Sequence, residues 1–392
     1  MSVTAAQGFS AAGIAAGIKE SGSLDLAVVV NQGPRCAAAG VFTSNRVKAA
    51  PVLWSEQVLK GGEVTAVVLN SGGANACTGP QGFQDTHATA EKTAESLNSA
   101  GYDGTGGHGA GTVAVASTGL IGLLLPMDKL LPGIDKAVAH LTPHGGEKAA
   151  IAIKTTDTVH KTAVAGGDGW TVGGMAKGAG MLAPGLATML VVLTTDADVD
   201  ASVLDTALRA ATRTTFDRVD SDGCMSTNDT VLLLASGASG VTPAQAEFDQ
   251  VVQSVCADLA RQLIGDAEGA SKDIRIEVVN AATEDDAVEV GRSIARNNLL
   301  KCAIHGEDPN WGRVLSAIGT TKAAFEPDRL NVAINDVWVC RNGSVGEDRD
   351  LVDMRYREVR ITADLAAGDA SAVIWANDLT AEYVHENSAY SS

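Results

Sequence analysis

The sequence predicts a mixed α/β protein in which sheets and helices form layers. Short apolar or β-branched runs bounded by Gly, Asn or Asp alternate with longer stretches whose apolar residues recur every three or four positions. The 392 residues allow two or three domains at ~150 residues each. Hydrophobic residues make up 45% and charged residues 19%, which is typical of a globular chain with a sizeable core.

The first half of the chain contains both patterns. Apolar and β-branched runs predict strands at 24–30, 64–69, 112–116 and 189–193. A polar stretch with regularly spaced Ala predicts a surface helix at 81–97. A further helix is expected at 127–141, because Leu130, Leu131, Ile134 and Val138 share one face.

The second half begins with a long amphipathic helix. Thr242 is its expected N-cap and Pro243 its first residue, and apolar residues from Phe248 to Leu263 follow at three- and four-residue steps. A domain boundary is expected near residue 275, which divides the chain into 1–275 and a smaller α+β unit, 276–392. Elements expected around and after the boundary are a strand at 274–279, a helix at about 284–300, and strands at 332–334, 337–340 and 359–362.

Charge excludes several classes of partner. The net charge of −18 and the lack of a Lys/Arg cluster disfavour binding to nucleic acids or to an anionic membrane surface. The uncharged stretch 178–195 has the length of a membrane span, but its glycines and Pro184 make a lipid-spanning helix improbable. Six widely spaced cysteines without a CxxC pair, together with a start that lacks a signal-peptide pattern, predict buried, reduced thiols and a cytoplasmic protein.

Two short motifs are better explained without a ligand. Residues 104–109 fit GxGxxG, but polar residues precede them and no helix pattern follows, so a glycine-rich loop is expected. His140 and His144 are four residues apart with Pro143 between them and no third ligand nearby. We therefore expect no metal site there.

The chemistry is predicted by the segment 177–190, KGAGMLAPGLATML. From the residues alone, Lys177 is interpreted as a solvated cap and Thr188 as an ordinary strand residue. The whole segment, however, resembles the self-cleavage site of the glutamate N-acetyltransferase (ornithine acetyltransferase) family of arginine biosynthesis. The chain also contains other motifs that resemble those of the family, in the family's order and between residue 8 and the C-terminus. They are GVFTSNRVKAAP (40–51), NSGGANACTG (70–79), STGLIG (117–122), TTDT (155–158), STNDT (226–230) and DPNWGR (308–313).

This resemblance implies an autoprocessing enzyme with a threonine nucleophile. The Ala187–Thr188 bond is expected to break by attack of the threonine hydroxyl, giving chains 1–187 and 188–392. The new α-amino group, with a pKa of about 8, would then serve as general base for its own hydroxyl. Thr118 and Gly119 match the family's oxyanion donors. From the residues alone, the same Ser-Thr-Gly segment is interpreted as a turn that ends a strand.

Substrate contacts are also implied by the resemblance. N-acetylornithine as donor and glutamate as acceptor share only their α-carboxylate and α-nitrogen, so recognition should depend on those groups. Lys177 would supply the local cation that a chain of net charge −18 needs. The family's substrate contacts fall on Thr155, Lys177, Thr188, Glu268, Asn387 and Ser392.

The implied fold is a layered α/β (α+β) sandwich of the DmpA/ornithine-acetyltransferase type with a smaller C-terminal α+β domain. Two copies of each mature chain and no cofactor are implied as well, and acetyl-CoA is left open as a second donor. Three alternatives remain: an N-terminal-nucleophile amidohydrolase or aminopeptidase, an uncleaved amino-acid-binding protein, and an acetyltransferase of a secondary pathway.

Overall fold

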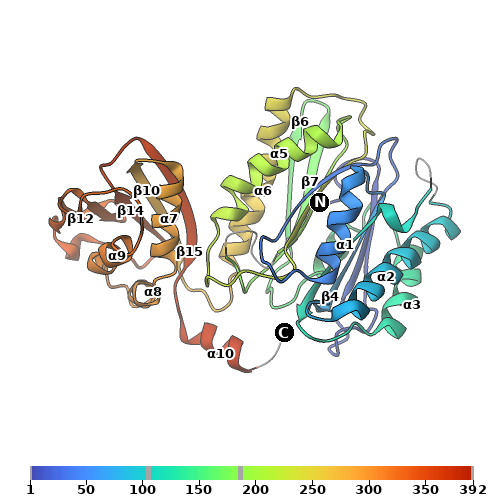
Figure 1. Cartoon of the computed structure of the whole chain (residues 1–392), viewed down its shortest axis with the longest axis horizontal. Helices are drawn as coiled ribbons and strands as arrows, with labels where there is room; N and C mark the ends of the chain where they lie inside the picture. Colours follow the sequence, from blue (N-terminus) through green and yellow to red (C-terminus); the bar gives the residue numbers. More distant parts are fainter. Residues whose placement is uncertain (1, 103–106, 184–188, 390–392) are drawn as a thin grey trace.

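The computed structural model describes residues 2–102, 107–183 and 189–389. Two sheets lie against each other in the larger part of the molecule, and a third sheet forms a lobe beside them (Figure 1). In the first sheet the strand order is β1-β2-β4-β5, with β4 and β5 parallel and the other neighbours antiparallel. The bounds of these strands are Phe9–Ile14 (β1), Leu26–Asn31 (β2), Ala66–Gly73 (β4) and Val113–Leu120 (β5).

The second sheet has the order β3-β9-β8-β7-β6, and its central pair, β8 and β9, is parallel. Both faces of β8 are buried, because Leu190 and Val192 pack toward the first sheet while Val191 and Leu193 pack toward helices. A strand covered on both faces reads as a continuous apolar run, which explains part of the uncharged stretch. The bounds are Ala37–Phe42 (β3), Lys161–Gly167 (β6), Trp170–Lys177 (β7), Leu190–Thr195 (β8) and Thr230–Ala235 (β9).

Helices cover the outer faces of both sheets, so the layers follow the order helix, sheet, sheet, helix. Helices α2 and α3 pack on the first sheet, and α5 and α6 pack on the second (Figure 1). Helix α1 covers the edge of β5, where Ser55 Oγ donates to the Val115 carbonyl at 2.7 Å. The bounds are Ala50–Val58 (α1), Gly79–Ser99 (α2), Met127–Ala139 (α3), Gly146–Ala152 (α4), Ala201–Thr214 (α5) and Gln245–Gly265 (α6), with short 3-10 segments at Leu59–Gly61, Ala110–Thr112 and Phe216–Arg218.

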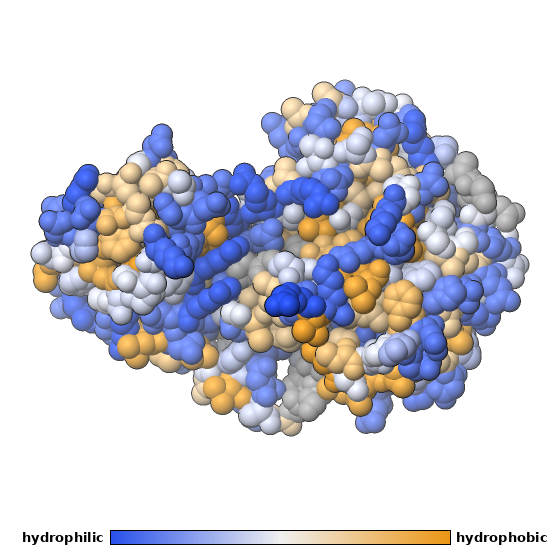
Figure 2. Space-filling view, viewed as in Figure 1, coloured by the Kyte–Doolittle hydropathy of each residue, from blue (hydrophilic) through white to orange (hydrophobic). Residues whose placement is uncertain are grey.

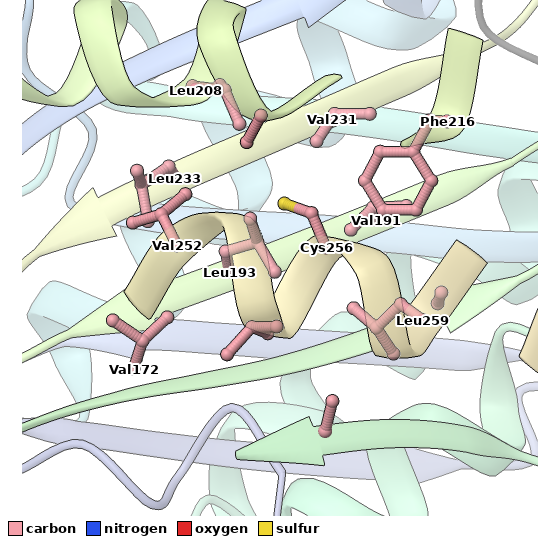
Figure 3. Packing of buried hydrophobic residues seen from close by; sticks show 14 of the residues in the cluster. Val172, Val191, Leu193, Leu208, Phe216, Val231, Leu233, Val252, Cys256 and Leu259 are labelled. Atoms are coloured by element: carbon pink, nitrogen blue, oxygen red, sulfur yellow. The ribbon is translucent and has the colours of Figure 1, made fainter. Parts of the chain in front are cut away.

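The core under α6 shows how the sequence pattern produces this layer. Val252, Cys256 and Leu259 lie on one face of α6 at three- and four-residue steps, and they pack against side chains of β7, β8 and β9 (Figure 3). Each large apolar side chain buried in this way stabilises the fold by about 1.5–3 kcal/mol. The second sheet, which carries Lys177, is therefore held rigidly.

The C-terminal lobe is built on a sheet of order β13-β12-β11-β14-β10-β15 with its own core. A notch along the upper edge of the space-filling view separates it from the sandwich (Figure 2). Helix α10 follows the last strand and lies below the gap between the two parts (Figure 1). The bounds are Asp273–Ala281 (β10), Glu284–Ala295 (α7), Asn298–His305 (α8), Trp311–Ile318 (α9), Asn331–Ile334 (β11), Val337–Arg341 (β12), Ser344–Val345 (β13), Glu358–Asp364 (β14), Ala370–Asn377 (β15) and Ala381–Ala389 (α10), with 3-10 segments at Pro327–Arg329 and Arg349–Leu351.

The layered α/β class is confirmed, while several details differ from expectation. The helix expected at 284–300 is two helices, because the Asn297 side chain accepts a bond from the Leu300 N–H and starts α8. Helix α6 begins at Gln245, after Thr242 and Pro243. The expectation of buried thiols is wrong for Cys77, Cys224 and Cys302, which are exposed. Among the described residues, no helix is long and apolar enough to cross a membrane.

Candidate active site

A cavity of about 360 Å³ brings together the described site residues that the sequence predicts. Ala187, Thr188 and Ser392 lie outside the described residues. Two groups line the cavity. The strand group comprises Thr118, Gly119, Thr155, Thr156 and Lys177, and the loop group comprises Gly180, Met181, Asp222, Cys224, Glu268, Tyr383 and Asn387, with Ile121 as a further lining residue.

Thr118 and Gly119 lie within β5, beyond the expected end of that strand. Thr118 is 2% exposed, and its Oγ1 accepts a hydrogen bond from Lys177 Nζ at 3.3 Å. Gly119 has φ of +128°, and a Cβ there would lie 2.5 Å from the Gly73 backbone nitrogen. Only glycine fits both the conformation and the close approach, so the backbone here is fixed by the sequence.

Lys177 is the last residue of β7 and is 2% exposed. Its interpretation as a solvated cap is therefore wrong. Burial lowers the pKa of Lys177, whereas the negative charges of Asp157, Asp229 and Glu268 act in the opposite direction. A buried ammonium that keeps an anionic neighbour can bind a substrate carboxylate strongly, because little water competes for it.

Asp157 holds the strand group together. Its Oδ1 accepts bonds from the Gly178 N–H and from Lys161 Nζ, both at 2.7 Å, and its Oδ2 accepts from the Thr155 N–H at 3.0 Å. Burial alone would raise the pKa of Asp157, but the charges of Lys177 and Lys161 and the Gly178 bond lower it to about 2. The carboxylate is therefore ionised and fixes the Thr155 loop next to the end of β7.

Glu268 comes from the loop after α6 and is only partly buried. Its backbone N–H donates to the Ala179 carbonyl at 3.0 Å, and Asn387 Nδ2 donates to its Oε2 at 2.9 Å. A Cβ at Gly180 would lie 2.5 Å from the carboxylate, so glycine leaves the room that this side chain occupies. The arrangement places one acceptor carboxylate, held by α10, at the cavity.

Asp222 provides a second carboxylate in the loop group. It accepts bonds from the backbone N–H groups of Met181, at 2.8 Å, and Cys224, at 3.0 Å. Burial raises the pKa of Asp222 above its usual value despite these bonds. Burial and the charges of Asp222 and Glu268 also raise the pKa of Tyr383 to about 12, so this phenol stays protonated at neutral pH.

A further buried acid, Asp229, binds the residue that follows the predicted cleavage position in sequence. The Met189 N–H donates to Asp229 Oδ1 at 3.1 Å, and Asp229 is fully buried. Burial raises the pKa of Asp229 well above its usual value, although bonds from Met189 and Ser226 and the charge of Lys177 oppose this rise. Asp229 fixes the start of β8 directly after residue 188.

The described residues contain no group of three or more His, Cys, Asp or Glu side chains placed to hold a metal ion. They provide a buried cation, a hydroxyl beside a fixed glycine N–H, and two carboxylates around one space. This set suits binding of an amino acid and stabilisation of an oxyanion.

Asp157, Asp222, Asp229 and Tyr383 were not predicted as site residues. Asp157 and Asp229 each follow hydroxyl or amide residues in the motifs TTDT and STNDT. Their position in these motifs is the only sequence feature that could have identified them as site residues. For Asp222 and Tyr383 no local pattern exists, because they reach the cavity from segments 161 residues apart.

Relatives of the chain have related sequences along its whole length. Residues 10–392 match the model of the ArgJ family. Over all 392 residues and the full length of each relative, the chain is 82% identical to the arginine biosynthesis bifunctional protein ArgJ of Streptomyces avermitilis and 64% identical to that of Thermobifida fusca.

Solved structures show related sequences as well. An ornithine acetyltransferase from Mycobacterium tuberculosis, solved in complex with ornithine, is 59% identical over 48% of this chain and 96% of its own, with a TM-score of 0.45. An ArgJ from Bacillus halodurans is 34% identical over 50% of this chain and 97% of its own, with a TM-score of 0.48. The chain belongs to the ArgJ family.

Proposed function

We propose that this protein transfers an acetyl group from N2-acetylornithine to L-glutamate through an acetyl ester on Thr188, as an enzyme of arginine biosynthesis. The products are ornithine and N-acetylglutamate. The observation that carries this proposal is the convergence of Thr118, Gly119, Thr155, Lys177, Glu268 and Asn387 on one cavity. Membership of the ArgJ family supports the same reaction class.

The first half-reaction forms the ester and releases ornithine. The Thr188 hydroxyl oxygen attacks the acetyl carbonyl while the α-amino group of Thr188 takes the hydroxyl proton. The carbonyl oxygen becomes an oxyanion, which accepts bonds from the Thr118 hydroxyl and the Gly119 N–H. The C–N bond then breaks, and the ornithine nitrogen leaves with the proton. Loss of one such donor typically raises the barrier by ~3 kcal/mol.

The second half-reaction reverses these steps with another amine. The glutamate α-amino group attacks the ester carbonyl, and the Thr188 oxygen leaves with a proton. Lys177 binds the α-carboxylate that both substrates share, with Thr155 beside it. Glu268 accepts a bond from the substrate nitrogen or from the ornithine ammonium, and Asn387 orients its carboxylate, as the 2.9 Å bond between them supports.

Thr188 becomes an N-terminus by self-cleavage at Ala187–Thr188. The mature enzyme would consist of chains 1–187 and 188–392, two copies of each, with Ser392 as a further substrate contact and with 1–275 and 276–392 as its domains. Asp229 supports this proposal, because its bond to the Met189 N–H holds the chain immediately after the scissile position. Acetyl-CoA is the second acetyl donor in the proposal, consistent with relatives that are named bifunctional.

Transfer of labelled acetyl from N-acetylornithine to glutamate tests the reaction. The wild-type protein should give labelled N-acetylglutamate, Thr188→Ser should keep part of this activity, and Thr188→Ala should give none. Release of free acetate without acetylglutamate would assign the chain to the hydrolases instead. Transfer by Thr188→Ala would remove the threonine from the mechanism.

A further inference from the structure

A second cavity, of about 670 Å³, adjoins the active site. The two cavities share Gly119, Thr155 and Thr156, so they meet beside the proposed oxyanion donor. The second one is called the apolar groove below. Besides these three shared residues it is lined by Ile18, Lys19, Glu20, Ser21, Gly72, Gly73, Leu120, Leu123, Leu124, Leu125 and Pro126.

The groove has a preformed shape. The buried Asp25 carboxylate accepts bonds from four successive backbone N–H groups, Ala16 to Lys19, which fixes the loop that forms one side. A Cβ at Gly72 would lie 3.1 Å from the Ile18 side chain, and one at Gly73 would lie 2.7 Å from the Leu125 side chain. Glycine therefore lets both sides approach the ends of β4 and β5, and the groove does not need to open for a ligand.

Large aliphatic side chains line this groove although they are accessible to water. Leu123 and Leu124 are 56% and 52% exposed. Ile121, which lines the active-site cavity described above (called the polar cavity below), is 46% exposed. Exposing three aliphatic side chains within four positions to water is unfavourable in free energy unless an apolar group covers them. They follow directly after Gly119, so an occupant of the groove reaches the site of the chemistry.

The chemistry of the lining decides which substrate fits. Lys177, Glu268 and Asn387 line the polar cavity and not the groove, so a free amino acid would leave its charges poorly matched in the groove. Lys19 is the cation among the groove residues, and its Nζ donates to the Leu24 and Lys154 carbonyls, which leaves one N–H for a ligand. A long, mainly neutral arm with an acyl group at one end and anionic groups at the other suits this lining.

We infer that the apolar groove binds the pantetheine arm of an acyl-CoA thioester and delivers its carbonyl to Thr188 past Gly119. This inference rests on the proposed function. The Thr188 oxygen attacks the thioester carbonyl, the C–S bond breaks, and the thiol leaves with the proton that the hydroxyl gave to the α-amino group. The acetyl ester formed is the same one that N-acetylornithine gives through the polar cavity.

Leu124→Glu tests the groove in the full-length enzyme. The variant places a carboxylate among the aliphatic side chains, and Leu299→Glu is a matched control, because Leu299 is 62% exposed and belongs to α8. Acetylation of glutamate is measured with acetyl-CoA, with N-acetylornithine, and with S-acetyl-N-acetylcysteamine, a thioester that lacks most of the arm. We expect kcat/KM for acetyl-CoA to fall at least tenfold in Leu124→Glu, with the other two donors within twofold of wild type and the control unchanged.

Several outcomes would overturn the inference and leave the proposed function intact. They are equal losses with all donors, no loss with acetyl-CoA, and a wild-type enzyme that uses N-acetylornithine but not acetyl-CoA. Equal losses accompanied by a change in oligomeric state would assign the groove to a second copy of the chain. Failure of the wild type with every donor would instead contradict the proposed function.

Discussion

The acid that supports the strand group and the acid within the loop group have opposite character. Asp157 lies behind the strand group, near Lys177 and Lys161, and these cations lower its pKa to about 2. In the loop group, Asp222 accepts bonds from the backbone N–H groups of Met181 and Cys224 and lies beside Tyr383, and burial raises its pKa. In the proposed mechanism, the ionised Asp157 would hold Lys177 for binding of a carboxylate, whereas the buried Asp222 would leave the other side of the cavity suited to a nitrogen.

The two groups also differ in how they are supported. Thr118, Gly119 and Lys177 lie on strands of the buried sandwich. Glu268 and Asp222 lie on loops, and Tyr383 and Asn387 lie on α10 at the end of the described chain. In the proposed reaction, the strands would hold the reacting carbonyl, and the loops and α10 would contact substrates whose side chains carry opposite charge.

The largest effect is expected from removing the cation of the strand group. Lys177→Met should lower kcat/KM for N-acetylornithine by about 100-fold, because a buried charge-assisted bond of ~3 kcal/mol is lost. Lys129→Met, an exposed lysine on α3, is the control and should retain full activity. Steady-state kinetics on both variants check this, and equal activity would place carboxylate binding elsewhere.

Asp157→Asn should lower the free energy of unfolding by about 2–3 kcal/mol at pH 7. The pKa of Asp157 is lowered from about 4 in the unfolded chain to about 2, so its contribution is fully present above pH 4 and is lost as the pH falls toward 2. Chemical denaturation at several pH values measures the difference between variant and wild type, which should shrink over that range. A difference independent of pH would show that the charge of Asp157 is not the cause.

Asp222→Asn should show the opposite pH dependence. Because burial raises the pKa of Asp222, ionisation opposes folding, and wild-type stability is lost relative to the variant as the pH rises through that raised pKa. Loss of one backbone bond should still cost about 1–2 kcal/mol at low pH. The same denaturation series tests this, and parallel curves for Asp157→Asn and Asp222→Asn would erase the distinction between the two groups.

Glu268→Gln should lower kcat/KM about tenfold, equivalent to ~1.4 kcal/mol, because a neutral amide replaces an acceptor that is only partly buried. Asn387→Ala should have a smaller effect, about threefold, since it removes the 2.9 Å bond that orients Glu268 together with a bond within α10 to the Tyr383 carbonyl. In the double variant, the Asn387 effect should largely disappear. Additive losses would mean that Asn387 acts independently of Glu268.

The parts of the fold that follow from local pattern could be predicted from the sequence. Helix α3 and strand β8 were anticipated because their apolar spacing is regular and their ends carry clear signals. The division between α7 and α8 at Asn297 could not be predicted, because the apolar spacing continues through this position. A single side-chain cap separates the two helices. Strand β15 also went unpredicted, although it pairs with β10 along nearly its whole length.

The site divides in a similar way. Thr118, Lys177 and Glu268 followed from motifs that resemble a known family, yet the burial of Lys177 did not, because it depends on a sheet and on Asp157, twenty residues earlier. Asp222 and Tyr383 come together only through tertiary structure. Burial and long-range charge pairing, which together set the pKa of each acid here, leave no trace in local spacing.

The most direct test of the account is the intact mass of the protein after incubation with N-acetylornithine in the absence of glutamate. The account predicts two chains, 1–187 and 188–392, with one acetyl group added to the second chain and removed again when glutamate is supplied. A single chain of 392 residues that still transfers acetyl, or a cleaved protein that never carries the acetyl group on residues 188–392, would contradict it.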